Sequence, residues 1–188
     1  MGKGVEDYRI DKRESFPIED FEKISIKTET VKVSVQSTRA EERVQIWFTG
    51  NSSEKVDFYI EKKEEEWEIV TKETKEAGNV EIKIAIPENI KCLSVTTTSG
   101  RINIARILPE EIHIKTQDGR VIMGHLPGRN SKIYVTTGKG DVRAEFKAAR
   151  VELEAETVSG RKTNNHEPNG KSFVKMEAFT ISGDITVS

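Results

Sequence analysis

Apolar and polar residues alternate along most of the chain, and from residue 93 onward a glycine interrupts the alternation at regular intervals. Apolar residues stand seven and five positions before each glycine, and in most copies also two and four positions after it. Because successive side chains of a strand point to opposite faces, each copy predicts a strand, a glycine corner and a second strand. We call such a copy a rung. The glycines recur about every 20 residues, as in stacked repeats, and they are Gly100, Gly119, Gly140, Gly160 and Gly183.

A threonine stands three positions before each glycine, on the same predicted face as the apolar residues. These residues are Thr97, Thr116, Thr137, Thr157 and Thr180. Rungs that stack in register would place them in one column, about 4.8 Å apart, where their hydroxyls can hydrogen-bond to one another. The glycines are expected where the backbone needs a positive φ or a close approach.

The position after each glycine is charged and is predicted to point outward at the corner. It is occupied by Arg101, Arg120, Asp141, Arg161 and Asp184. From Arg120 onward the sign alternates, so neighbouring rungs would form surface ion pairs worth about 0–1 kcal/mol each. In this order Arg161 separates Asp141 from Asp184, which would lie roughly 10 Å apart. The fourth rung differs from the others, because Lys162 and Asn164 replace its apolar residues after the corner.

The residues before the glycine repeat follow two further patterns. Residues 24–35 resemble a divergent first rung in which Val31 occupies the glycine position. Residues 36–91 contain four alternating segments separated by turn signals, which favour an antiparallel meander near the N-terminal end. Phe16, Ile18 and Phe21 are expected to form an apolar plug against the first strand. At the other end the last rung stops at residue 188, which predicts an open edge at residues 183–188.

The pattern as a whole predicts an all-β fold: a single-stranded β-solenoid, or β-helix-like stack, of about 20-residue rungs with that meander near its N-terminal end. We expect one domain over residues 1–188, divided into a first rung (16–35), a cap of antiparallel strands (36–91) and five glycine-cornered rungs (92–188).

Charge is balanced and dispersed, which bears on possible partners. Lys and Arg number 30 and Asp and Glu number 32, for a net charge of −2, and the charges interleave along the strands. This distribution argues against a nucleic-acid partner. No apolar run approaches the roughly 20 residues of a transmembrane helix, and residues 1–15 lack a signal-peptide core. We therefore expect a cytoplasmic protein if this is the full natural chain, or an extracytoplasmic envelope domain if it is a fragment of an anchored protein.

Candidate chemical groups are few. Cys92 is the only cysteine, so no internal disulfide is possible, and we interpret it as a packing residue. His113, His125 and His166 lack the spacing of a metal-ligand pair and are interpreted as surface residues. Residues 169–172 imitate the end of a phosphate-binding loop, but no helix is expected to follow them. We predict no catalytic residue, no metal ligand and no cofactor.

Because side chains alternate along a strand, the Trp47 side chain points away from the face that Ile46 and Phe48 share. It is either exposed or packed against a second layer. An exposed tryptophan suits contact with a sugar or a protein, and packing within the cap is the alternative. The predicted interaction surface is therefore Trp47, Arg101, Arg120, Asp141, Arg161 and Asp184.

Three copies of the repeat carry a family resemblance. Residues 97–102, 157–161 and 180–185 resemble the T-x-S-G-D-I unit of the bacterial toastrack family, also called the putative adhesin family. The likeness extends upstream to residue 16 and so covers nearly the whole chain. It implies a β-solenoid of two facing sheets, and many members resemble extracytoplasmic domains behind a membrane anchor. The family defines no functional residues to carry over. This chain departs from its pattern at residues 117–118 and 138–139 and in the fourth rung.

Three functions are compatible with these features. The first is a non-enzymatic binding or interaction module of the bacterial cell envelope, presenting a flat charged face to a protein or an envelope glycan. The second is a self-assembling structural solenoid that forms homo-oligomers through the open C-terminal edge. The third, an enzyme acting on a glycan, is the weakest, because the sequence shows no acid–base pair of carboxylates.

Overall fold

The computed structural model describes residues 8–17, 22–38, 43–73 and 78–188, which form strands in two sheets. No helix long and apolar enough to cross a membrane occurs in these ranges. In chain order the strands are β1 (Tyr8–Pro17), β2 (Lys23–Lys27), β3 (Lys32–Ser37), β4 (Arg43–Ser52), β5 (Asp57–Lys62), β6 (Glu66–Lys72), β7 (Asn79–Ile86), β8 (Cys92–Thr97), β9 (Ile102–Ala105), β10 (Glu111–Thr116), β11 (Val121–Leu126), β12 (Ser131–Lys139), β13 (Val142–Phe146), β14 (Arg150–Ser159), β15 (Lys162–Asn164), β16 (Phe173–Ser182) and β17 (Ile185–Val187).

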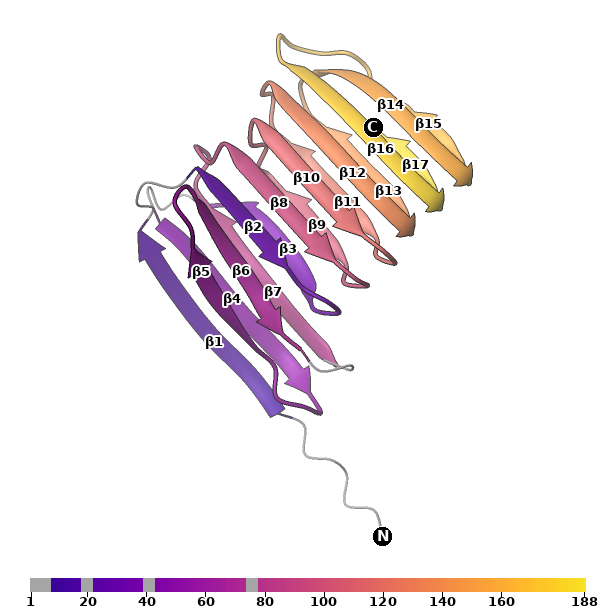
Figure 1. Cartoon of the computed structure of the whole chain (residues 1–188). Coiled ribbons are helices and arrows are strands. Elements are labelled where there is room, and N and C mark those ends of the chain that lie inside the picture. Colours follow the sequence, from indigo (N-terminus) through magenta and orange to yellow (C-terminus); the bar gives the residue numbers. More distant parts are fainter. Residues whose placement is uncertain (1–7, 18–21, 39–42, 74–77) are drawn as a thin grey trace.

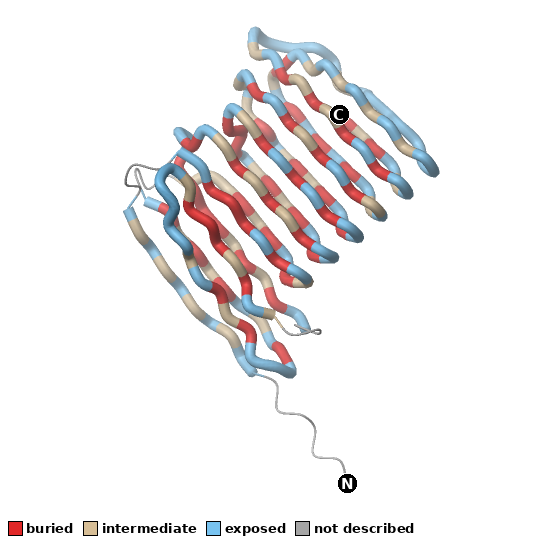
Figure 2. Tube along the Cα trace, viewed as in Figure 1, coloured by how far each residue is buried: buried red, intermediate tan, exposed pale blue. Residues whose placement is uncertain are grey.

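The strands stack as two layers along the length of the molecule (Figure 1). The nine-stranded sheet, here called sheet A, has the order β1-β4-β7-β3-β9-β11-β13-β17-β15. The eight-stranded sheet, sheet B, has the order β14-β16-β12-β10-β8-β2-β6-β5. Rungs pair in parallel and in register, so that Ile112 lies between Leu93 and Ile133 in sheet B. Buried and more exposed residues alternate along the strands (Figure 2), as expected of strands with one face in the core.

The last two rungs stack in the reverse of their chain order. In sheet B, β16 lies between β12 and β14, and in sheet A, β17 lies between β13 and β15. The predicted open edge at residues 183–188 is therefore wrong, because the fourth rung, β14–β15, forms that end. Residue polarity explains the exchange: Ile185 and Val187 are fully buried, whereas Lys162 and Asn164 are exposed. A rung with polar core positions can cover an apolar rung, but it would be costly in the interior.

The N-terminal strands also differ from the predicted meander. The four strands β4, β5, β6 and β7 divide between the two sheets, where β4 pairs antiparallel with β7 and β5 pairs antiparallel with β6. β6 also continues sheet B by pairing in parallel with β2, which sets Trp67 beside Ile24 and Ile69 beside Ile26. β7 pairs in the same way with β3. Alternation predicted these strands correctly as half-buried, but an alternating strand can join either sheet.

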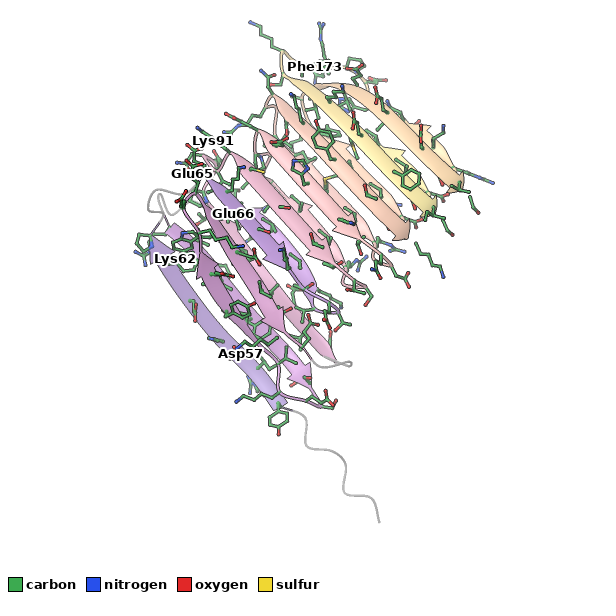
Figure 3. All side chains as sticks on the ribbon, viewed as in Figure 1. Asp57, Lys62, Glu65, Glu66, Lys91 and Phe173 are labelled. Atoms are coloured by element: carbon green, nitrogen blue, oxygen red, sulfur yellow. The ribbon has the colours of Figure 1, made fainter. Side chains whose placement is uncertain are left out.

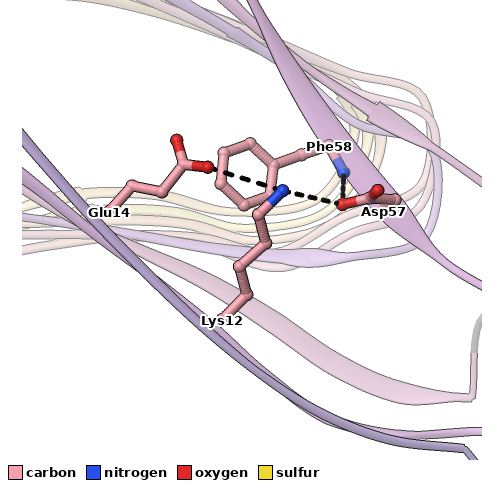
Figure 4. Close-up of polar contacts among 4 residues, drawn as sticks. All are labelled: Lys12, Glu14, Asp57 and Phe58. Carbon is pink, nitrogen blue, oxygen red and sulfur yellow. Dashed lines mark hydrogen bonds and ion pairs between the residues drawn. The ribbon is translucent and has the colours of Figure 1, made fainter.

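At the N-terminal end of the stack, β1 of sheet A contacts β5 and β6 of sheet B. The Phe16 ring packs on Trp67 with centroids 4.3 Å apart. Lys12 on β1 reaches across to β5, where its Nζ lies 3.2 Å from Asp57 Oδ1 and 4.5 Å from the centre of the Phe58 ring (Figure 4). Phe16, one member of the predicted apolar plug, is therefore partly buried against the core. The other two members of the predicted plug, Ile18 and Phe21, lie outside the described residues.

The corner glycines permit a close approach between rungs. A Cβ built on Gly119 would lie 2.5 Å from the Gly100 carbonyl oxygen and 2.6 Å from Thr116 Oγ1, well inside van der Waals contact. At the other four corners as well, the added atom would collide with the backbone carbonyl of the neighbouring rung. Among these five glycines only Gly140 has a positive φ, of 152°. Contact distance, more than backbone conformation, therefore requires glycine at the corners.

The threonine column forms, with hydroxyl-to-hydroxyl bonding at one step. Thr97 Oγ1 lies 2.9 Å from Thr116 Oγ1 and donates to the Gly100 carbonyl at 3.0 Å. Farther along, Thr157 and Thr180 donate to corner-glycine carbonyls at 3.0 and 3.3 Å. The Thr137 hydroxyl is buried and has no hydrogen-bond partner in the structure. The column therefore stabilises the corners mainly by binding backbone carbonyls.

A carboxylate supports the corner of the first rung. Glu73, which follows β6, accepts hydrogen bonds from the backbone amides of Thr30 (2.8 Å) and Val31 (2.9 Å) and from the Thr71 hydroxyl. It also accepts from the amide of Glu29 at 2.5 Å. Burial alone would raise the pKa of Glu73, but the bonds from Thr71 and these amides outweigh burial and hold the pKa below its ordinary 4.5. Glu73 thus satisfies amides of a corner where Val31 replaces glycine.

Replacing Gly119 by alanine tests the close approach. We expect Gly119→Ala to lower the free energy of unfolding by about 1–3 kcal/mol, because the added methyl forces two rungs apart. Urea denaturation followed by circular dichroism measures the change. Gly124→Ala is the matched control, since no heavy atom lies within 4 Å of its added Cβ. Equal loss in both variants would contradict the contact argument.

Replacing Glu73 by glutamine tests the corner cap. A carboxylate whose pKa is depressed by folding stabilises the protein above its unfolded pKa, and this stabilisation is lost as pH falls through the folded pKa. Glu73→Gln should therefore be less stable than the wild type by about 1–3 kcal/mol at pH 7, with the gap closing below about pH 4.5. Unfolding curves across pH, with the exposed Glu156→Gln as control, measure this. A gap that stays constant with pH would rule out the carboxylate cap.

Candidate interaction surface

The structure divides the predicted interaction surface in two. The five charged corner residues form one exposed column, in the spatial order Arg101, Arg120, Asp141, Asp184 and Arg161. Trp47 lies elsewhere, half-buried on β4 in sheet A, between Arg13 of β1 and Lys83 of β7. The corner column and Trp47 therefore cannot act as one continuous contact patch.

The aspartates of the corner column are engaged by backbone. The Asp184 amide donates to Asp141 Oδ1 at 2.9 Å, and the Arg161 amide donates to Asp184 Oδ1 at 2.8 Å. The two aspartates are thus neighbours, and the prediction that Arg161 separates them is wrong, as is the predicted alternation of sign at this end. The exchange of the last two rungs is the cause. Each aspartate caps an amide of the next rung.

The outer face of sheet B carries exposed apolar side chains near one end. Val158 on β14 is 75 % exposed, and Ile181 and Phe179 on β16 are 52 % and 37 % exposed. Strand register sets Phe179 beside Glu156 and brings Val158 level with Ile181. We call these three residues the apolar patch. Their side chains therefore place apolar atoms in solvent on neighbouring strands of one face.

Aromatic and charged side chains extend the same face toward the middle of the molecule. Tyr134 on β12 stacks on His113 of β10, with ring centroids 4.9 Å apart and planes 14° apart. A groove runs along the edge where strands of this sheet begin, and Lys91 and Phe173 lie along that edge (Figure 3). Lysine and glutamate side chains line the groove together, so its charge is mixed.

One group of side chains on this face has the composition of a metal site. Ligand atoms of Cys92, Glu111 and His113 lie within 4.8 Å of one another. Burial, followed by the nearby Glu111 carboxylate, raises the pKa of the Cys92 thiol. Cys92 and His113 were interpreted separately from the sequence, as a packing residue and a surface residue. The offset from the corner glycine could have shown that they are close. Cys92 and Glu111 both stand eight positions before a corner glycine, so in-register rungs place them side by side.

The other two histidines lie on different elements. His125 Nδ1 lies 3.3 Å from Glu145 Oε1. His166 Nε2 lies 2.7 Å from the Ala149 carbonyl oxygen, with its ring against Phe146. Neither belongs to the cysteine-containing group, and each is explained by its local contacts.

Comparison with known proteins adds a family and a fold. A family model described as Toastrack DUF4097 matches residues 73–188. The chain is similar to a solved structure from Clostridium sporogenes, described as a putative cell adhesion protein, with 17 % identity and a TM-score of 0.68, covering 95 % of this chain and 99 % of that chain. A second, from Bacteroides fragilis and described as a putative adhesin, has 14 % identity and a TM-score of 0.44, with coverage of 95 % and 97 %. No curated protein matches the sequence.

The capping role of the corner aspartates can be tested by truncation. Asp141→Ala removes the acceptor for the Asp184 amide and should cost about 0.5–2 kcal/mol of unfolding free energy, as loss of a capping side chain does. Arg120→Ala occupies the equivalent position two rungs away from Asp184 and should change stability by less than about 0.5 kcal/mol. Urea unfolding measures both. Similar effects in the two variants would show that Asp141 is a surface residue only.

Proposed function

The chain belongs to the Toastrack DUF4097 family, and from this premise we propose that it is a non-enzymatic binding module of the bacterial cell envelope. The proposal treats the whole chain as one single-stranded solenoid of about 20-residue rungs, a rigid support for flat contact surfaces. The Clostridium sporogenes protein that shares its fold is described as a putative cell adhesion protein, and that description supports an adhesion-like role here.

The apolar patch is the observation that carries the proposal. Val158, Phe179 and Ile181 lie on adjacent strands whose backbones are held in register by the stack, so the patch needs no reorganisation to meet a partner. Burying exposed apolar area contributes roughly 25 cal/mol per Å². Apolar contacts on a preformed surface are typical of the central part of a protein interface.

The neighbouring charges indicate the chemistry of the partner. Glu152, Glu154 and Glu156 are exposed on β14, next to the patch. Their charge favours a partner with basic residues around an apolar centre, because complementary potentials steer association. Two of the three patch residues are aliphatic and do not stack on sugar rings as aromatic side chains do. A protein of the cell envelope therefore fits this surface better than a glycan.

Self-assembly is the alternative function. Because the last two rungs are exchanged, the sheet edge available for it lies at β14 and β15 and not at residues 183–188. Among the strands that the structure describes, β14 and β15 are the last of their sheets, and each has one side without a strand neighbour. An unpaired edge can add a strand from a second copy. However, the glutamates of β14 would repel the same edge of another molecule. Val187 on β17 is buried between β13 and β15, so a charge introduced there would test stability and not assembly.

Binding to isolated envelopes of the host bacterium tests the proposal. We expect the wild-type chain to sediment with these envelopes and the combined variant Val158→Ser, Phe179→Ser, Ile181→Ser to bind at least about tenfold more weakly, a loss of about 1.4 kcal/mol. Protease treatment of the envelopes should abolish retention, because the proposed partner is a protein.

Ile122→Ser is the matched control, since Ile122 is a half-buried residue of sheet A and should leave binding unchanged. Wild-type binding to protease-treated envelopes and purified peptidoglycan would favour a glycan partner instead. No retention of the wild type would overturn the envelope proposal. Light scattering over a hundredfold concentration range completes the test, and a mass that rises with concentration would favour self-assembly.

A further inference from the structure

We propose that Cys92, Glu111 and His113 form a binding site for one divalent ion of the zinc class on the outer face of sheet B. The inference does not depend on the proposed envelope partner. Its basis is the meeting of three different ligand types that belong to two neighbouring rungs, separated by a corner in the sequence and joined by strand pairing in the fold.

The backbone holds the three side chains in place. Cys92 on β8 is the direct register partner of Glu111 on β10, and His113 follows two positions later on the same face. The His113 ring is further oriented by stacking on Tyr134 at 4.9 Å. Ligands placed on neighbouring strands, with one ring fixed by packing, satisfy the rule that a metal site should be built on rigid elements.

The distances require little adjustment. His113 Nε2 already lies 3.1 Å from Glu111 Oε1, and all three ligand atoms lie within 4.8 Å of one another. Zinc bonds of about 2.0–2.3 Å in a tetrahedron place neighbouring ligand atoms roughly 3.3–3.8 Å apart. Small rotations of the side chains would therefore close the group around an ion. The Glu111 and His113 side chains are 44 % and 46 % exposed, so an ion can enter from solvent.

The ligand types select among metals. Thiolate and imidazole ligands suit zinc and its neighbours in the first transition row, whereas magnesium and calcium prefer a full set of oxygen ligands. A thiolate, a carboxylate and a neutral imidazole carry two negative charges in total, which a divalent ion neutralises. Three protein ligands leave the fourth tetrahedral position open to water or to a group from another molecule.

Two lysines flank the site and set its electrostatics. Lys23 on β2 is the register partner of Cys92 on its other side, and Lys132 on β12 is the register partner of Glu111. Burial and Glu111 raise the pKa of the Cys92 thiol and outweigh the charge of Lys23, which lowers this pKa. Both lysines also repel a free cation. The three ligands and a divalent ion together carry no net charge. Repulsion by the lysines therefore lowers the affinity for the ion but does not change the positions of the ligands.

Cobalt(II) is a suitable probe, because a thiolate bound to it gives a charge-transfer absorption that oxygen and nitrogen ligands do not. We expect the wild-type chain to bind one Co²⁺ with this absorption, and Zn²⁺ to displace it. Cys92→Ser should lose the absorption completely. His113→Ala and Glu111→Gln should each weaken binding at least tenfold.

His125→Ala is the matched control, because His125 also lies beside a glutamate but has no thiol in its group. It should bind Co²⁺ as the wild type does. A second measurement uses the wild-type chain alone: Zn²⁺, but not Mg²⁺, should slow alkylation of Cys92 by iodoacetamide. Absence of the cobalt–thiolate absorption, no protection from alkylation, or one ion shared by two chains would overturn the proposed site.

Discussion

Close contact between corner glycines and the carbonyl groups of neighbouring rungs is the constraint on which the structure depends. A side chain at Gly119 or Gly140 would push two rungs apart at the corner, where the chain crosses from one sheet to the other. With the corners in contact, positions of β10 lie beside the same positions of β8 and β12. Residues with the same offset from the corner glycine therefore form a column that runs along the stack. The threonine column, the aspartate caps and the cysteine–glutamate–histidine group all follow from that alignment.

Much of the fold could be predicted because buried and exposed residues alternate so regularly. Alternation located the strands and the core positions, and the glycine frame predicted the corners. It could not predict which rung stacks on which, since rungs with the same frame offer similar partners to one another. The polar residues Lys162 and Asn164 were the only sign that the fourth rung lies at an end. Likewise, β4 to β7 were recognisable as strands, but their distribution between two sheets depends on long-range pairing.

The candidate surfaces were harder to predict than the fold. The corner charges were correctly expected to be exposed, yet two of them, Asp141 and Asp184, serve backbone amides. The apolar patch was missed although the glycine frame places Phe179 and Ile181 four and two positions before Gly183, on the outward face of the strand. Placing Cys92 beside Glu111 required only the glycine frame. In a repeat of this kind, reading residues by their offset from the corner is more informative than reading them by their spacing along the chain.

Strand β14 is synthesised before β16, the strand with which it pairs in sheet B. The same holds for β15 and β17 in sheet A. On the ribosome, earlier rungs can add to the growing stack in turn, but the native partners of β14 and β15 do not exist until residues 173–187 have been synthesised. The covering rung therefore reaches its place in the stack only after the rung that it covers, and its pairing joins segments that are not successive in the chain.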